Sequence, residues 1–594
     1  MYKKPFYESR KIGNLKEMLE TSADLYADRT AFLVKNKQSD IYEPIKYSKF
    51  KEDVDAIGTA MCALGLSGGR VGIIGENRYE WAVSYMATIN GTGVVVPIDK
   101  ELPTGEISSL LTSAKVDALV FSGSIKEKVN EVIKNAGDTL NVRLWIDMDG
   151  SSGADGESDI ASGQSVKATR STNLAFSKLL EIGRKLLSEG DKSFTSAVID
   201  PEVMSIILFT SATTDKSKAV MLSHSNISSN LVAMCNMTYI GKDDIFLSVL
   251  PMHHTYEYTC GFLCPIYRGG CVAFCEGLRH IPKNLQESKA SVMLGVPLIF
   301  EAMYRRIWDQ AAKKPETLKK LKLGLGITRL LGALGIDLRR KLFAPIHDAF
   351  GGNLRLLVSG AAGIDPHVSK GFRRLGMFLI QGYGLTECSP IVALNRDILF
   401  EDASAGLPMP GIEVRIDNPG HDGMGEIVVR GPCVMLGYYE DPEATAKVLK
   451  DGWFHTGDLG MMDKRSFVYI TGRMKNVIVT KNGKNIYPEE IETLLNRSPY
   501  IKESLVYGKQ VAGWDDVAVA AQIVPDIDKI QETKGGPLPA DELVEAVHAL
   551  IEADVRAVNK GLVLYKHIRD FKIRDTEFEK TTSKKIKRYM AKTN

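Results

Sequence analysis

Apolar and polar positions alternate along most of the chain in two recurring kinds of segment. Short apolar runs bounded by glycine or polar residues are typical of buried strands, and the amphipathic stretches between them are typical of helices. We predict strands at 70–75, 93–98, 117–121, 205–209, 245–250, 291–295, 354–359 and 377–381. We predict helices ending near 90, at 105–114, beginning near 226, and at 255–267, 298–312 and 337–350. Strands that alternate with helices predict an α/β fold with a mostly parallel sheet.

The pattern changes after residue 400 and again near residue 473. Between 400 and 472, short β-like pieces follow one another with Gly and Pro turns, which predicts a small β-barrel-like subdomain. From 474 to 594 the pattern is typical of a separate, small α+β domain. Because 594 residues exceed what one hydrophobic core holds, we expect a large N-terminal domain, 1–473, and a small C-terminal domain, 474–594.

Composition narrows the class of protein. The chain is 44% hydrophobic and 25% charged, and its formal net charge is +2, so its charge does not indicate a nucleic-acid partner. No apolar run approaches the length of a membrane span, and the N-terminus lacks the apolar core of a signal peptide, so we expect a cytoplasmic protein. The stretch 321–338 is apolar and basic enough for peripheral contact with the inner face of the membrane, although a helix packed on its own core is the commoner explanation.

Four of the eight cysteines are clustered, at Cys260, Cys264, Cys271 and Cys275. Their paired spacing leaves a metal site open as one interpretation. Their apolar neighbours favour the other, in which the thiols are buried and pack as small hydrophobic side chains. We favour burial because structural zinc sites usually have a tighter cysteine pair on a turn.

The stretch 205–224 brings hydroxyl groups and cations to the end of a predicted strand. Residues 210–218 read Thr-Ser-Ala-Thr-Thr-Asp-Lys-Ser-Lys, and Ser223 is a suitable N-cap for the following helix. Hydroxyls and backbone N–H groups can donate to phosphate oxygens while lysines neutralise charge, so this loop is a candidate anion site. It is not a Walker A sequence, and a polar surface loop is the alternative until context decides.

Further motifs supply that context. In chain order they are Ser-Gly-Ala-Ala at 359–362, Gln-Gly-Tyr-Gly-Leu-Thr-Glu at 381–387, Gly-Trp-Phe-His-Thr-Gly-Asp at 452–458, Thr-Gly-Arg-Met-Lys-Asn at 471–476, Asn-Gly-Lys-Asn-Ile-Tyr-Pro-Glu-Glu-Ile-Glu at 482–492 and Lys-Thr-Thr-Ser-Lys-Lys-Ile-Lys-Arg at 580–588. With the loop, this ordered set resembles the adenylate-forming superfamily of acyl-CoA synthetases, luciferases and peptide-synthetase adenylation domains, over essentially the whole chain. The stretch 338–362 looks most like the long-chain fatty acyl-CoA synthetases.

The resemblance implies a two-step ligase that forms a carbon–sulfur bond. A carboxylic acid attacks the α-phosphate of ATP to give acyl-AMP and pyrophosphate, and the thiol of coenzyme A then displaces AMP. It also implies an acyl- and ATP-binding N-terminal domain and a mobile C-terminal lid. Because carboxylate and triphosphate are both anionic, such a site needs cations and donors placed before reaction, including Mg²⁺.

The resemblance also assigns roles residue by residue. The β- and γ-phosphates would be held by Thr210, Ser211, Thr213, Thr214 and Lys218, the α-phosphate would accept from Thr386, and the Mg²⁺ site would include Glu387 together with Thr210. Adenine would stack on Tyr383 with Gly384, with close approach allowed by Gly360, Ala361 and Ala362, while Asp458 would accept from the ribose hydroxyls and Arg473 would reach the ribose or α-phosphate. Lys585 would bridge the acyl carboxylate and α-phosphate, Lys475 would be the hinge, Gly483 would line the thiol tunnel, and His254 would lie between nucleotide and acyl group. Each residue alone also has a purely structural interpretation, and their order favours the functional one.

The loop departs from the family pattern, which usually reads Thr-Ser-Gly-Thr-Thr-Gly-x-Pro-Lys-Gly. Here Ala212, Asp215, Ser217 and Ala219 replace two glycines, the proline and the last glycine. The charge of Asp215 would face a triphosphate and repel it, with Lys216 offsetting this in part. Ser583 and Lys584 also differ from the usual pattern, so the reactive lysine is Lys585 or its neighbour. We expect an active enzyme with weakened contacts to the pyrophosphate end of ATP.

Two alternatives to a medium- or long-chain fatty acyl-CoA synthetase stay open. The adenylate could be delivered to a separate carrier protein, since the chain has no obvious carrier domain of its own. The altered loop also suits a degenerate protein that binds nucleotide or acyl groups without catalysis. The length of the acyl chain cannot be read from the sequence, because a methylene changes binding by only about 1–3 kcal/mol.

Overall fold

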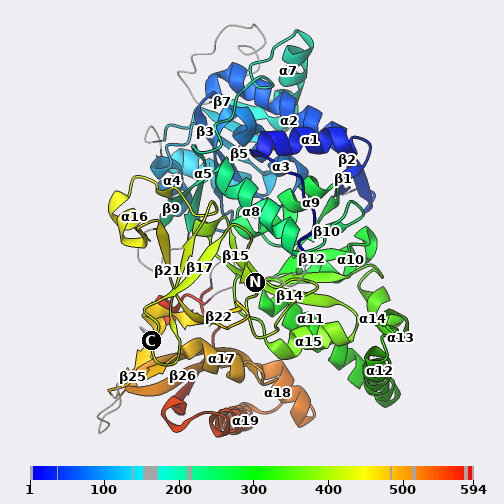
Figure 1. Cartoon of the computed structure of the whole chain (residues 1–594), viewed down its shortest axis with the longest axis vertical. Coiled ribbons are helices and arrows are strands. Elements are labelled where there is room, and N and C mark those ends of the chain that lie inside the picture. The colour runs from blue at the N-terminus through cyan, green and yellow to red at the C-terminus, as the bar shows by residue number, and fades with distance from the viewer. Residues whose placement is uncertain are drawn as a thin grey trace. The chain divides into compact units, whose positions relative to one another are not determined.

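The computed structural model describes residues 5–36, 38–136, 140–150, 172–210, 217–481, 484–510, 517–580 and 586–591 (Figure 1). The chain forms two compact units, Met1–Val414 with Val429–Phe454, and Arg415–Val428 with His455–Asn594. The boundary predicted between residues 473 and 474 lies inside the second unit, and it stays a prediction.

The first unit contains a nine-stranded sheet in which six adjacent strands, β14 to β1 in spatial order, are parallel. The added strands β15, β16 and β2 pair antiparallel at its two ends. In spatial order the strands are β16 (Leu407–Pro408), β15 (Ile391–Leu394), β14 (Phe378–Gly384), β13 (Leu356–Ser359), β12 (Val292–Gly295), β10 (Ile245–Ser248), β11 (Cys271–Phe274), β1 (Thr30–Lys35) and β2 (Tyr42–Lys46).

A second sheet of the same unit has eight strands. The pairs from β8 through β4, β3, β5 and β6 to β7 are parallel, and β9 joins β8 and β19 antiparallel. In spatial order the strands are β19 (Gly437–Tyr438), β9 (Lys218–Ser223), β8 (Met204–Thr210), β4 (Gly93–Ile98), β3 (Gly69–Ile74), β5 (Ala118–Phe121), β6 (Leu144–Asp147) and β7 (Thr172–Ala175).

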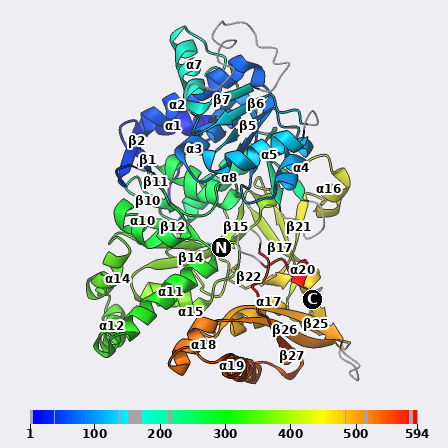
Figure 2. The ribbon, with the colours of Figure 1, turned by 180° about the vertical axis from the view of Figure 1, so that it is seen from behind.

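Helices cover these sheets. Those of the first unit are α1 (Leu15–Tyr26), α2 (Tyr47–Met61), α3 (Tyr79–Ala87), α4 (Thr104–Ser113), α5 (Lys126–Ala136), α7 (Phe176–Ser188), α8 (His224–Met237), α9 (Cys264–Arg268), α10 (Ile281–Ser288), α11 (Pro297–Ala312), α12 (Pro315–Ala333), α13 (Arg339–Leu342), α14 (Ala344–Ala349), α15 (Pro366–Arg374) and α16 (Pro442–Val448). In Figures 1 and 2, α1, α2 and α3 lie to one side of β5, and α4 and α5 to the other. Contacts between helices are close: a Cβ on Gly183 of α7 would lie 1.8 Å from the carbonyl oxygen of Ala56 in α2.

Most of the predicted elements are confirmed to within a few residues. Ser223 caps α8 as expected, because its side chain accepts from the N–H of Asn226 and the Asn226 side chain returns the bond. Two helix predictions were too simple. The region 255–267 is a π-helix, Tyr256–Leu263, followed by α9, and the region 337–350 is divided between α13 and α14. Strand β9 was not predicted, since its apolar run follows a loop read only for its polar groups.

The β-rich region forms a five-stranded sheet through which the boundary between the units passes. Its strands are β17 (Glu413–Asp417), β18 (Gly425–Arg430), β21 (Trp453–Met462) and β20 (Leu449–Lys450), with β22 (Val468–Arg473) paired to β21. The rest of the second unit packs helices on a three-stranded sheet. Its elements are β23 (Ile478–Val479), β24 (Asn485–Ile486), α17 (Pro488–Leu495), β25 (Ile501–Gln510), β26 (Val517–Pro525), α18 (Ile527–Lys534), α19 (Ala540–Lys560), β27 (Ile568–Ile573) and α20 (Arg588–Ala591).

Candidate active site

Predicted site residues of the first unit gather at one edge of the nine-stranded sheet. Strands β10, β12, β13 and β14 are parallel neighbours, so their carboxyl ends meet at the same edge. His254 follows β10, Gly360 to Ala362 follow β13, and Tyr383 and Gly384 end β14. The N–H of Gly360 donates to the carbonyl of Gly295 at the end of β12, 3.1 Å away. The structure thus brings together residues that are up to 130 positions apart in the sequence, at the edge where open α/β sheets bind ligands.

Gly360 is required by its surroundings. A Cβ at this position would lie 2.8 Å from the ring of Tyr256, whose hydroxyl donates to the carbonyl of Val358, 2.8 Å away. Ala361, the next residue, has a left-handed φ of 70°, an uncommon conformation for a residue with a side chain. Ala361 and Ala362 are exposed, so this turn is open to solvent.

Glu387 lies on the short 3₁₀ turn Thr386–Cys388 directly after β14. Its Oε1 accepts a hydrogen bond from the hydroxyl of Tyr438, 3.0 Å away. Burial, together with the Glu387 carboxylate, raises the pKa of Tyr438 well above its usual value, so the phenol remains a donor. The Tyr438 ring also faces Lys218, whose Nζ lies 4.5 Å from the ring centroid. Tyr438 therefore links the predicted phosphate lysine to the predicted metal ligand.

Tyr438 was not predicted as a site residue. It belongs to the two-residue strand β19, which pairs with β9 at Val220. Nothing in the short Gly-Tyr stretch at 437–438 signals chemistry, because only the strand pairing places the ring beside Lys218. Tyr438 is near the predicted loop in space but not in sequence, so the sequence alone gives no signal for it.

Thr210 and Lys218 face each other across the two strands that flank the predicted phosphate loop. Strands β8 and β9 are antiparallel, these residues are in register, and the Thr210 hydroxyl donates to the Lys218 carbonyl over 3.4 Å. The structure therefore holds both ends of the loop together. Ser211, Ala212, Thr213, Thr214, Asp215 and Lys216 lie outside the described residues.

The two adjacent histidines differ in environment. His253 is buried, and burial with the nearby charge of Lys100 lowers its pKa to about 3, so its ring is neutral near pH 7. His254 is half-buried, and its ring centroid lies 4.2 Å from that of His253. His254 is thus the more accessible of the pair at the sheet edge.

In the second unit, Asp458 and Arg473 are paired across adjacent strands. The Asp458 side chain is almost fully buried in β21, and its Oδ1 lies 2.7 Å from Nε of Arg473 in β22. The Asp458 N–H donates to the hydroxyl of Thr456, which itself donates to the carbonyl of Ile427. Lys475 is exposed on the turn Met474–Asn476 that follows β22. Gly483 and Lys585 lie outside the described residues.

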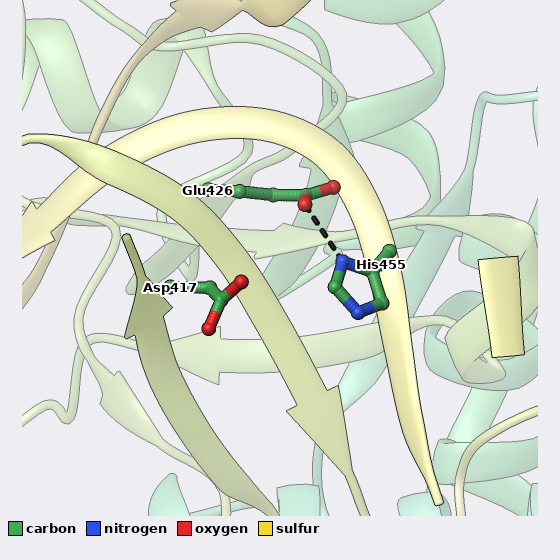
Figure 3. Close-up of side chains that lie close together, drawn as sticks. All are labelled: Asp417, Glu426 and His455. Carbon is green, nitrogen blue, oxygen red and sulfur yellow. Dashed lines mark hydrogen bonds and ion pairs between the residues drawn. The ribbon is translucent and has the colours of Figure 1, made fainter. Parts of the chain in front are cut away.

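A cluster of Asp417, Glu426 and His455 lies on strands β17, β18 and β21 (Figure 3), and His455 is three residues before Asp458 on β21. Their ligand atoms lie within 4.8 Å of one another, which is close enough to share a cation. Hydrogen bonds nonetheless account for the cluster. Glu426 accepts from the N–H of Gly457 at 2.9 Å and pairs with Nδ1 of His455 at 2.7 Å. Both oxygens of Glu426 thus hold the part of β21 that directly precedes Asp458.

The clustered cysteines behave as buried apolar groups. Cys260, Cys264 and Cys271 are buried, and Cys275 is partly exposed. Burial raises the pKa of Cys271 to about 12, which keeps its thiol protonated.

Comparisons with known proteins identify the class. The family model of the AMP-binding enzymes matches residues 19–439, and the chain belongs to that family. It is therefore a member of the adenylate-forming acid–CoA ligases that the ordered motifs resemble.

The relatives by sequence are fatty acyl-CoA synthetases. The chain is 27% identical over 532 residues to fatty acyl-CoA synthetase B of Dictyostelium discoideum, covering 85% of this chain and 76% of that protein. It is 28% identical over 516 residues to the human long-chain-fatty-acid–CoA ligase 1, covering 82% of this chain and 70% of that protein.

Solved structures share the fold. The anthranilate CoA ligase AuaEII in complex with anthranoyl-AMP gives a TM-score of 0.73 at 17% identity, covering 99% of this chain and 97% of that one. The Mycobacterium tuberculosis fatty acyl CoA synthetase gives 0.62 at 20% identity, covering 98% and 97%. These neighbours were solved as ligases of different acids, so the fold does not select the acid.

Proposed function

We propose that this chain is an ATP-dependent fatty acyl-CoA synthetase acting on medium- or long-chain acids. In the first step, a carboxylate oxygen of the acid attacks the α-phosphorus of ATP. The bond to the β-phosphate breaks, and pyrophosphate leaves. In the second step, the sulfur of coenzyme A attacks the acyl carbon, the bond to the phosphate oxygen breaks, and AMP leaves with the thioester formed.

The observation that carries the proposal is the link from Lys218 through Tyr438 to Glu387. A cation for phosphate and a carboxylate for a metal are held together before any ligand binds, and such preorganisation is the main means of stabilising a phosphoryl transfer. Thr386 is on the same turn as Glu387, in the position expected for the donor to the α-phosphate. Thr210 lies one strand pairing away from Lys218, where it can add a hydroxyl.

Glu387 suits Mg²⁺. Its Oε1 is engaged by Tyr438, while Oε2 has no hydrogen-bond or ion-pair partner in the described part of the chain. Hard carboxylate oxygen is the ligand type that Mg²⁺ prefers, usually together with substrate phosphates. When bound, the ion would supply positive charge to the phosphate oxygens.

The remaining roles extend the proposal to the sheet edge and the second unit. Tyr383 and Gly384 would hold adenine beside the Gly360–Ala362 turn, and His254 would face the reacting carboxylate. Asp458 would accept from the ribose hydroxyls, with Arg473 orienting its carboxylate. Lys585 as the bridging lysine, Gly483 at the thiol tunnel and Lys475 as the hinge rest on the family resemblance alone.

The choice of a fatty acid is supported by the names of the sequence relatives, all fatty acyl-CoA synthetases or long-chain ligases among those compared. The π-helix Tyr256–Leu263 beside His254 is largely apolar and buried, as a wall for an acyl chain should be. Coenzyme A is proposed as the acceptor on the same grounds, with a carrier protein as the alternative.

The test is to measure AMP and pyrophosphate release with ATP, Mg²⁺ and a series of straight-chain acids, with and without coenzyme A. We expect pyrophosphate that depends on the acid, and acyl-CoA only when coenzyme A is present. Glu387→Gln should abolish both products, while Glu52→Gln, an exposed glutamate of α2, should not. Pyrophosphate exchange without thioester would indicate a carrier protein. If neither AMP nor pyrophosphate is released, even after Ala212→Gly and Asp215→Gly, the proposal is refuted and a binding protein is favoured.

A further inference from the structure

Helix α12 has two apolar faces. The inner face packs on the core of the first unit through Leu321, and through Gly324, where a Cβ would lie 3.0 Å from the ring of Phe343. The outer face carries Leu323 and Leu330, with the exposed Ile327 between them, and Leu334 continues this face directly after the last helical residue; the three leucines are 65%, 69% and 71% exposed. Because these residues are spaced three or four apart, they form one stripe along the helix.

Such a stripe is unusual for a surface helix. Leucine is normally buried, and singly exposed leucines need no explanation, but a continuous apolar stripe indicates an interaction surface. The inner contacts with Phe343 already account for the helix as part of the fold. The outer leucines therefore add nothing to the core and lower the solubility of the protein, which indicates that a partner covers them.

Basic residues flank this stripe. Lys319, Lys320, Lys322 and Arg329 are exposed, and none forms an ion pair with another residue that the structure describes. The helix contains one acidic residue, Glu316, at its first turn. Lys341, also exposed, extends the basic rim onto α13. The surface is therefore apolar along its centre and positive at its rim.

We propose that the outer face of α12 docks on an anionic lipid surface. Exposed leucines would enter the boundary between headgroups and acyl chains, and the lysines would contact the negative headgroups. Electrostatics disfavours a second copy of this chain as the partner: a symmetric contact would bring the same unpaired cations against one another.

The position of the helix permits such contact. Figures 1 and 2 show α12 at the outer edge of the first unit, beyond α11 and α15, and Figure 1 shows α13 next to it. In the described part of the chain, no helix is both long and apolar enough to cross a bilayer. The proposed contact is thus a surface attachment through one helix, and it does not depend on which acid the protein activates.

The test is co-sedimentation of the full chain with vesicles of phosphatidylcholine alone and of phosphatidylcholine mixed with phosphatidylglycerol. We expect binding to the anionic vesicles that weakens as salt is added. Combined Leu323→Gln, Leu330→Gln and Leu334→Gln should lower the affinity by about tenfold or more, since each leucine removes apolar area from water on docking. Combined Lys319→Gln, Lys320→Gln and Lys322→Gln should give a similar loss and a weaker salt dependence.

Matched controls separate docking from a general effect of polar substitution. The double variant Leu25→Gln with Val544→Gln removes two apolar side chains that are 62% and 69% exposed but lie on other helices. This variant should bind the vesicles as the wild type does. Thermal unfolding checks that each variant is folded, and because Gln is a good helix former, α12 should persist. Unchanged vesicle binding in both α12 variants would overturn the proposal. So would equal binding to neutral vesicles, or loss of self-association by the leucine variant in ultracentrifugation without vesicles.

Discussion

Glu257 is a buried acid whose ionisation should limit the stability of the first unit at high pH. It lies on the π-helix Tyr256–Leu263 with no exposed surface. Its Oε1 accepts from the hydroxyl of Ser248, 2.7 Å away, and its Oε2 has no hydrogen-bond partner among the residues that the structure describes. Burial raises the pKa of Glu257 from 4.5 to about 8, so the carboxyl is neutral in the folded chain near pH 7.

The sign of the effect follows from the two pKa values. The unfolded chain releases the proton above pH 4.5, whereas the folded chain keeps it until about pH 8. Because the pKa of Glu257 is higher in the folded chain than in the unfolded chain, the protonated carboxyl contributes its full stabilisation below pH 4.5. This stabilisation is lost as the pH rises to about 8. One pKa unit corresponds to about 1.4 kcal/mol, so from about pH 5 to about pH 8 the loss should be about 3 kcal/mol. Glu257→Gln replaces the acid with a neutral group of the same shape and should remove this dependence.

The assay is chemical denaturation of wild type and variant over that pH range, followed by tryptophan fluorescence. Four of the five tryptophans, 81, 145, 308 and 453, belong to the first unit, so the signal reports mainly on it. We expect the two proteins to differ little near pH 5 and the Gln variant to become the more stable one as the pH rises. Glu101→Gln, at an exposed position of the same unit, should leave the pH dependence unchanged. Equal pH slopes for wild type and Glu257→Gln would refute the reasoning, because they would mean that the acid is ionised in the folded chain.

Three further predictions concern substitutions elsewhere in the chain. Gly183→Ala should lower the melting temperature and the free energy of unfolding, the latter by about 2 kcal/mol or more, because its Cβ would lie 1.8 Å from a carbonyl of α2. Gly105→Ala has open space around it in α4, so it should raise the free energy of unfolding by up to about 1 kcal/mol. Equal effects of the two substitutions in thermal unfolding would contradict this. Glu426→Ala should raise the KM for ATP about tenfold with a smaller effect on kcat, because it removes the hydrogen bonds that hold the part of β21 before Asp458. An unchanged KM in the pyrophosphate assay would contradict this reasoning. Asp215→Gly should lower the KM for ATP, because the family resemblance implies that this charge faces the triphosphate and repels it; an unchanged or higher KM would contradict this.

Sequence patterns predicted eight of the twelve parallel strands that the structure describes, because a strand buried on both faces is a nearly continuous apolar run; β1, β6, β7 and β11 were missed. The run at 93–98 is such a strand, and it is β4. Helix α12 was harder: apolar residues on two faces remove the one-sided periodicity on which helix prediction depends, so a helix packed on its own core was only the commoner of two interpretations for the stretch 321–338.

Some residues of the candidate site could be predicted from the sequence and others could not. Glu387 and Asp458 were found because each belongs to a recognisable local motif. Tyr438 and Glu426 were missed because their importance comes from pairing between strands that are distant in the sequence: β19 with β9, and β18 beside β21. A single sequence carries no signal for such pairing when the strands are short.

The division of the five-stranded sheet bears on how the C-terminal region could be produced as a separate fragment. A fragment beginning at 455 would keep most of β21 and all of β22 but leave behind β18, whose Glu426 and Ile427 hold residues 455 to 457. A fragment beginning at 474 avoids this loss. Its main hydrophobic core, from Ile478 to Ile568, is made entirely of its own residues, so it should fold and express where the longer fragment would aggregate through an unpaired strand edge.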